Sequence, residues 1–147
     1  MHYATGKAPG TVDAAPGLIK RAAGQAAVTS TGYIGTQRDE GGAAATDYTC
    51  VINVEAIDIS SNDETYTFRV IGSNAADRSD GQILDMLQLG RAGIVNIETR
   101  NTAAGDQYIM QFRTMRNFTM FRYLDLHMGV AGTTPSITFN AYFTKGT

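Results

Sequence analysis

Two ionisable residues on one predicted strand could perform acid–base chemistry. Asp125 and His127 are separated by a single residue, and this spacing in a strand places both side chains on the same face of the sheet. A carboxylate beside an imidazole can transfer protons near neutral pH. The same pair also fits the polar outer face of a strand. We favour that second interpretation, in which both are ordinary surface residues.

The single cysteine offers no clear nucleophile. Cys50 lies among apolar residues in the middle of a predicted strand, where a thiol is usually a small buried hydrophobic group. A lone cysteine also excludes an intrachain disulfide and a cysteine-rich zinc site. The sequence contains no Gly-x-Ser-x-Gly elbow, phosphate-binding loop or dinucleotide fingerprint. We therefore predict no catalytic residue.

Two acidic turns could offer oxygen ligands to a metal ion. Asn74, Asp77 and Asp80 share one loop, and an Asn-Asp-Glu run at residues 62–64 forms the other. The first loop lacks the alternating aspartates and the closing glutamate of a calcium-binding loop. We interpret both as ordinary polar turns and predict no metal and no cofactor, with calcium in the 74–81 loop left open.

A stretch at residues 112–123 interleaves arginines with aromatic residues. Such a stretch can stack bases and hold phosphates, can form a protein interface, or can be two strands with arginines on the wet face. The net charge of −2 and the pI of about 5.6 disfavour a nucleic-acid partner. The candidate partner-binding residues here are Arg113, Arg116, Phe118 and Arg122.

The length and composition are those of one β-rich domain. The chain has 147 residues, no Trp and only 18% charged residues, against about 25% in an average domain. No apolar run is long enough to span a membrane, and the first residues lack the apolar core of a secretory signal. We expect no membrane partner and a protein that stays where it is made, or in a particle assembled there.

Period-two alternation of apolar and polar residues predicts about eight strands. Their spacing indicates an antiparallel sandwich or a closed barrel, and eight strands in two sheets is the jelly-roll number. The predicted class is an all-β, jelly-roll-like sandwich, with hairpins joining 48–57 to 65–70 and 121–130 to 137–143. The predicted strands are 28–34, 48–57, 65–70, 82–89, 94–97, 108–114, 121–130 and 137–143, and the predicted inward residues are Ile52, Val54, Phe68, Val70, Leu126, Met128, Phe139 and Phe143.

The first 27 residues differ in composition from the rest. They are rich in Gly, Ala and Pro and cannot bury enough apolar surface to fold alone. We predict an N-terminal arm at 1–27, with one helical turn possible at 18–23, outside a sandwich at 28–147. Deleting residues 2–24 should then leave the sandwich folded. The arm's candidate partner-binding residues are Tyr3, Lys7, Val12, Leu18, Ile19, Lys20 and Arg21.

Three segments occur in an order that carries a family resemblance: FRVIGSN at 68–74, ILDMLQLG at 83–90 and RYLDLHMGV at 122–130. With the break at 131–135 and the last strand, this order resembles the small jelly-roll cement (decoration) proteins of tailed-bacteriophage capsids. The resemblance implies a hairpin of the last two strands and a non-enzymatic, commonly trimeric protein on the outer capsid face. It further implies the major capsid protein as partner and the virion as location, after synthesis in the host cytoplasm.

Two other classes remain open. A carbohydrate-binding or fibre-type β-sandwich could attach to a cell surface, although the absence of Trp argues mildly against it. A small β-barrel enzyme such as a cupin needs a histidine-rich metal site. His127 is the only histidine within the predicted sandwich, which nearly excludes the enzyme.

Overall fold

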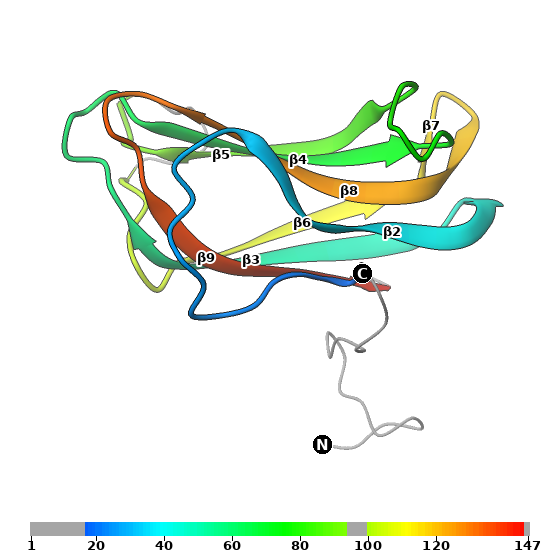
Figure 1. Ribbon diagram of the computed structural model, residues 1–147, viewed down its shortest axis with the longest axis horizontal. Helices are drawn as coiled ribbons and strands as arrows, with labels where there is room; N and C mark the ends of the chain where they lie inside the picture. Colours follow the sequence, from blue (N-terminus) through cyan, green and yellow to red (C-terminus); the bar gives the residue numbers. More distant parts are fainter. Residues whose placement is uncertain (1–16, 94–99, 146–147) are drawn as a thin grey trace, which may run out of the picture.

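Two antiparallel β-sheets pack face to face (Figure 1). The computed structural model describes residues 17–93 and 100–145. No helix occurs among these residues, and hence none that could cross a bilayer. The strands within them are β1 (Ile19–Arg21), β2 (Gly32–Ala44), β3 (Asp47–Ile57), β4 (Thr65–Ser73), β5 (Gln82–Gly90), β6 (Gln107–Arg113), β7 (Met115–Arg116), β8 (Thr119–Ala131) and β9 (Ile137–Lys145).

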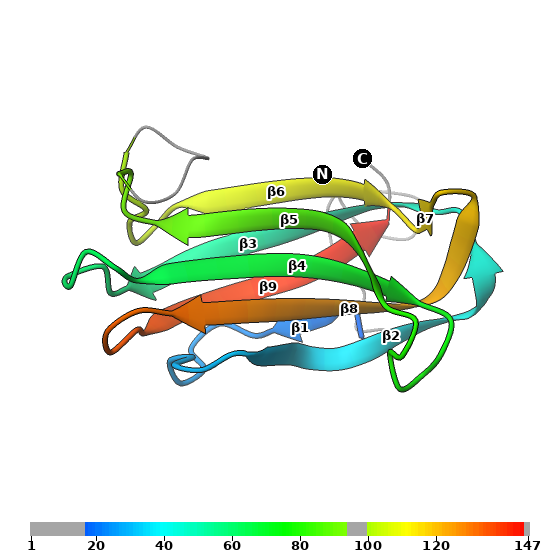
Figure 2. The same ribbon diagram turned by 90° about the horizontal axis from the view of Figure 1, so that it is seen from above.

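The strand pairing within the described residues is that of a jelly roll. One sheet has the order β1-β9-β3-β6 and the other β2-β8-β4-β5, with the two-residue β7 on β8. Leaving out β7, the first strand in the sequence pairs with the last, β1 with β9. Moving inward along the sequence from both ends, β2 pairs with β8, β3 with β6, and β4 with β5. Nested pairs of this kind are one long hairpin folded over on itself. The predicted jelly-roll-like sandwich is confirmed, and Figure 2 shows its two layers from above.

The core lies between the two sheets. All eight predicted inward residues are buried, with at most 3% of each exposed. Phe68 on β4 and Phe139 on β9 meet edge to face across the layers, with ring centroids 5.0 Å apart. Burying an aliphatic or aromatic side chain of this size stabilises the fold by roughly 1.5–3 kcal/mol. The alternation therefore identified the inner faces correctly.

Both predicted hairpins are wrong. β3 and β4 lie in different sheets, and so do β8 and β9. The connections at 58–64 and 132–136 therefore cross from one layer to the other. Alternation indicates which face of a strand is buried, but it does not indicate the strand's partner. The chain neighbours that do pair are β4 with β5 and β7 with β8.

The sandwich begins earlier in the sequence than predicted. β1 pairs with β9, with Ile19 opposite Tyr142. Leu18 and Lys20 are only 7% and 3% exposed. The segment expected to lie outside the sandwich, with a possible helical turn, is thus an edge strand from residue 19 to 21. A three-residue strand shows too little alternation to be recognised. Residues 1–16 and 94–99, which include Tyr3, Lys7, Val12 and the predicted strand 94–97, lie outside the described residues.

The second strand is also displaced from its predicted position. The strand expected at 28–34 begins later, at Gly32, and continues as β2 through a Gly/Ala segment to Ala44. Val28 makes only an isolated bridge to Ile137. β2 can continue because it pairs with β8 through two register shifts, and such irregularities tolerate glycine.

Candidate functional site

A tight hairpin projects an aromatic side chain from one end of the sandwich. Met115 pairs with Met120 and Arg116 with Thr119, so Asn117 and Phe118 alone form the turn between β7 and β8. Their φ angles are 50° and 65°, and a type I′ turn requires positive φ at both positions. Asn accepts this conformation, whereas a bulky residue disfavours it. Phe118 is nevertheless placed there with 96% of its surface exposed.

Hydrogen bonds hold the base of this hairpin in place. The buried Thr114 donates its backbone N–H to the Thr46 carbonyl at 3.0 Å, and its own carbonyl accepts from the Phe121 N–H at 2.9 Å. Its hydroxyl accepts from the Thr46 N–H at 2.8 Å. Arg116 donates to the Ile83 carbonyl on β5 at 2.6 Å. These bonds tie the base of the hairpin to β5 and to the connection between β2 and β3.

The three arginines of this stretch do not form one basic patch. Arg113 pairs with Asp47 at 3.1 Å and Arg122 with Asp39 at 2.8 Å. Arg116 is engaged with the main chain of β5. Exposed ion pairs contribute little to stability, but they neutralise two of the three charges. The surface around Phe118 therefore suits a protein contact better than a polyanion.

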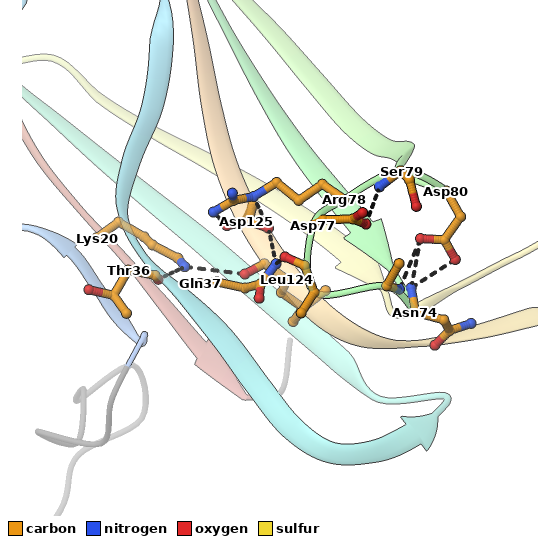
Figure 3. A network of polar contacts seen from close by, with 12 residues as sticks. Lys20, Thr36, Gln37, Asn74, Asp77, Arg78, Ser79, Asp80, Leu124 and Asp125 are labelled. Atoms are coloured by element: carbon orange, nitrogen blue, oxygen red, sulfur yellow. Dashed lines mark hydrogen bonds and ion pairs between the residues drawn. The ribbon is translucent and has the colours of Figure 1, made fainter.

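Asp125 is not the surface residue that the sequence predicts. Its carboxylate is 2% exposed because the 74–81 loop covers it (Figure 3). Arg78 from that loop donates two hydrogen bonds to it, at 2.9 and 3.0 Å. Gln37 on β2 donates a third at 2.9 Å. This carboxylate fastens the loop to the five-stranded sheet.

His127 lies on the same sheet face as Asp125 but has different neighbours. Its ring meets Tyr33 edge to face, with centroids 5.0 Å apart. Its Nδ1 lies 3.4 Å from a guanidinium nitrogen of Arg69. Burial, and then the positive charge of Arg69, lower the pKa of His127. These contacts favour a neutral ring with a packing role over a general base activated by Asp125.

Lys20 is buried between the two sheets rather than free to bind a partner. Its Nζ donates to the Thr36 carbonyl at 2.8 Å and to the Leu124 carbonyl at 3.4 Å (Figure 3). The same atom lies 4.6 Å from the centroid of the Phe143 ring. Burial lowers the pKa of Lys20 to about 8, against the opposing influence of Asp125. The prediction of Lys20 and the buried Leu18 as partner-binding residues is therefore wrong.

The 74–81 loop uses its carboxylates for its own backbone. Asp80 accepts hydrogen bonds from the N–H groups of Asn74 and Ala75, and Asp77 accepts one from Ser79. These bonds lower the pKa of both carboxyl groups. No cluster of three or more His, Cys, Asp or Glu side chains that could hold a metal occurs in 17–93 or 100–145.

Cys50 lies in the core between the sheets, with no measurable exposure. Burial raises the pKa of its thiol to about 12. The thiolate is the nucleophilic form of cysteine, so this side chain acts as a small core residue.

The outer face of the four-stranded sheet carries a row of apolar side chains that the sequence did not reveal. The register aligns Ile19, Tyr142, Val51 and Ile109 across β1, β9, β3 and β6. Ile19 and Ile109 are 49% and 58% exposed. Uncharged polar residues flank the row on both sides: Thr144, Thr49 and Gln111, and Asn140, Asn53 and Gln107. Strand register, which sets this row, is not visible in the sequence.

An open hollow lies at the β1 end of this row. We call it the β1 pocket; its volume is about 430 Å³ and its lining includes Ile19, Arg21, Ala22, Ala23, Asn140 and Tyr142. Two predicted partner-binding residues, Ile19 and Arg21, therefore do lie at a surface feature. The pocket is lined by residues of β1 and β9 in the four-stranded sheet, whereas the β7–β8 hairpin extends from the five-stranded sheet (Figure 2).

Comparisons with known proteins supply no family. No family model matches the chain, and no curated protein matches it. Among solved structures, it is similar to the CBM22-1–GH10 modules of Clostridium thermocellum endo-1,4-β-D-xylanase 10B complexed with xylohexaose, with a TM-score of 0.38 and 11% identity over 86% of this chain. The chain spans about a fifth of that protein, 21% of its length. The strand pairing described above, not this likeness, defines the fold.

Proposed function

We propose that the protein is a non-enzymatic structural protein that binds the outer surface of a viral capsid and cements neighbouring major capsid protein subunits. The jelly-roll pairing of β1 with β9 and of the strands nested inside them carries this proposal. Jelly rolls occur in viral capsid proteins, lectins and cupins. The resemblance of 68–74 and 122–130 to phage cement proteins selects the first of these classes.

The filled interior disfavours the cupin-like alternative. A cupin holds its metal inside the sandwich, whereas Phe68, Phe139 and Phe143 occupy that space here. The exposed apolar groups lie instead on the outside, at Phe118 and along the row that includes Ile109. This is the distribution expected of a binding protein. The proposal places the protein on the virion, with further copies of itself, as a homotrimer, among its partners.

A sedimentation experiment tests the proposal. Heads of the virus that encodes the protein are prepared without it, mixed with purified protein and separated on a density gradient. We expect saturable co-sedimentation and a higher temperature of DNA release from the decorated heads. Heads that already carry the protein are the control and should take up none. Failure to bind undecorated heads at micromolar concentration would overturn the proposal.

A glycan-binding function is the second candidate, and one observation favours it. Tyr142 lies beside amide side chains on an open sheet face, and aromatic and amide groups are the usual lining of sugar sites. These amides are already engaged, however, since Gln107 donates to Asn53 and Asn53 to Asn140, both at 2.8 Å. Affinity electrophoresis through gels containing soluble polysaccharide tests it. Retardation of the wild type that Tyr142→Ala abolishes would establish glycan binding.

A further inference from the structure

The molecule has a protruding apolar side chain and an apolar hollow on separate surfaces. Phe118 stands at the tip of the β7–β8 hairpin, at one end of the five-stranded layer. The β1 pocket opens on the outer face of the opposite layer. The hairpin of the same chain therefore does not reach the pocket, so a Phe118 side chain can enter it only from a second molecule.

We propose that Phe118 of one copy inserts into the β1 pocket of a second copy. The pocket volume of about 430 Å³ lies within the range of roughly 300–1,000 Å³ that holds small ligands, so it accommodates a benzyl group. Ala22 and Ala23 leave room because their side chains are small. Tyr142 can pack against the inserted ring, whereas the guanidinium of Arg21 already lies 5.2 Å from the centroid of the Phe139 ring and donates to the Ala26 carbonyl.

The conformation of the turn supports a binding role for Phe118. Positive φ is unfavourable at a bulky residue, and exposing the ring gains nothing for the monomer. Residues held in an unfavourable backbone conformation of this kind are found mainly where they serve a function. The hydrogen bonds of Thr114 and Arg116 fix the hairpin before binding, and such preorganisation lowers the entropic cost of association.

Charge and surface character also favour a second copy as the occupant. The ion pairs Arg113–Asp47 and Arg122–Asp39 neutralise the arginines on both sides of the hairpin. The hairpin surface therefore does not strongly repel Arg21 of a second copy, and it has no net positive charge that would favour a polyanionic partner. The row from Ile19 to Ile109 continues the apolar surface beyond the pocket. Met120, which is 44% exposed at the base of the hairpin, can extend the contact onto that row.

The contact joins two different surfaces and is therefore heterologous. Heterologous contacts close into rings or continue as filaments. A ring of three copies agrees with the homotrimer of the proposed function, but the contact does not require capsid binding. The two proposals can consequently fail independently.

Complementation between two variants tests the contact. Phe118→Ser removes the inserted group and leaves the pocket intact, whereas Ala22→Arg blocks the pocket and leaves Phe118 intact. By multi-angle light scattering we expect an oligomeric wild type and two monomeric variants, with self-association weakened at least about 30-fold, as at an interface hot spot. An equimolar mixture of the variants should form dimers, because one functional contact remains between unlike chains. Met86→Ser, at a residue of β5 that is 55% exposed and lies outside the proposed contact, should leave the oligomer unchanged.

Several outcomes would overturn this proposal. They are a monomeric wild type at all concentrations, an oligomeric Phe118→Ser variant, and a mixture that stays monomeric. Phe118→Gly guards against misfolding, since it should form a more stable monomer. If the wild type is monomeric and Ala22→Arg abolishes binding to heads, the capsid protein is the occupant and self-association is wrong. A wild type that oligomerises without binding heads would instead contradict only the proposed function.

Discussion

Lys20 shows how far a residue's environment can depart from what its type suggests. A lysine in a Gly/Ala-rich segment predicts a solvent-exposed cation. Its side chain instead crosses the sheet interface and ends beside Phe143. The carbonyls of Thr36 and Leu124 accept its hydrogen bonds, which offset part of the cost of burying the ammonium group. The sequence could not predict this, because strands from both sheets supply the partners.

The buried ammonium predicts a dependence of stability on pH. Burial lowers the folded-state pKa of Lys20 to about 8, whereas the ordinary value is 10.5. Between these values the unfolded chain binds more protons, so the free energy of unfolding rises with pH. Lys20→Met removes this dependence. We expect the wild type to gain up to about 3 kcal/mol relative to the variant between pH 8 and 10.5, as measured by urea unfolding.

The paired comparison cancels other alkaline titrations. Burial raises the pKa of Cys50 to about 12, so deprotonation of this thiol in the unfolded chain lowers stability at high pH. Both proteins retain Cys50, and its effect drops out of the difference. A difference between wild type and Lys20→Met that stays constant from pH 7.5 to 10.5 would contradict the assigned pKa.

At the scale of the element, the β7–β8 hairpin has a turn residue that weakens it. Gly is the preferred second residue of an Asn-Gly type I′ turn, and the chain has Phe118 instead. At protein concentrations low enough for both proteins to be monomeric, Phe118→Gly should therefore raise the free energy of unfolding by about 1 kcal/mol. Thermal denaturation should show a rise of about 3 °C. Asn117→Gly, at a residue that already tolerates positive φ, is the matched control and should change the midpoint less.

A close approach between β1 and β2 makes a second element-scale prediction. Gly35 has φ of +73°, and a Cβ there would lie 2.3 Å from the Lys20 carbonyl oxygen. Gly35→Ala should therefore lower the free energy of unfolding by roughly 2–4 kcal/mol, through backbone strain and overpacking. Gly32→Ala, on the same strand with no atom within 4 Å of the added Cβ, should leave stability nearly unchanged. Equal effects of the two substitutions in urea titrations would show that β1 does not pack against β2 in this way.

The sequence predicts the faces of strands better than their partners. Alternation identified the buried sides of β3, β4, β8 and β9, because the apolar/polar pattern of a half-buried strand is complete within that strand's own residues. β1 was missed because three residues cannot display a period. The two expected hairpins were wrong because pairing depends on strands far apart in the chain. Residue type led to the prediction that Phe118 and Arg116 bind a partner, and this stays a prediction. The apolar row from Ile19 to Ile109 could not be predicted, because it requires a register that no single segment encodes.

At the scale of the whole molecule, the jelly roll depends on contacts between the ends of the sequence. β1 and β9 form the outermost of the nested pairs, and the Phe143 N–H donates to the Leu18 carbonyl at 2.7 Å. Such long-range pairs form late and slow the folding of β-sandwiches. β1 is consequently part of the closed structure and not an attachment to it.

Two truncations test whether β1 belongs to the sandwich or to an N-terminal arm that extends to residue 27. Removal of residues 2–16 takes away none of the described strands, and the melting temperature should stay close to that of the full chain. Removal of residues 2–24 also deletes β1 and the buried Leu18. It exposes the edge of β9 and leaves the Phe143 N–H without its acceptor. A loss of about 3 kcal/mol from these contacts should lower the melting temperature by roughly 10 °C. If the two truncated proteins melt together, β1 adds nothing to the sandwich and the N-terminal arm extends to residue 27 after all.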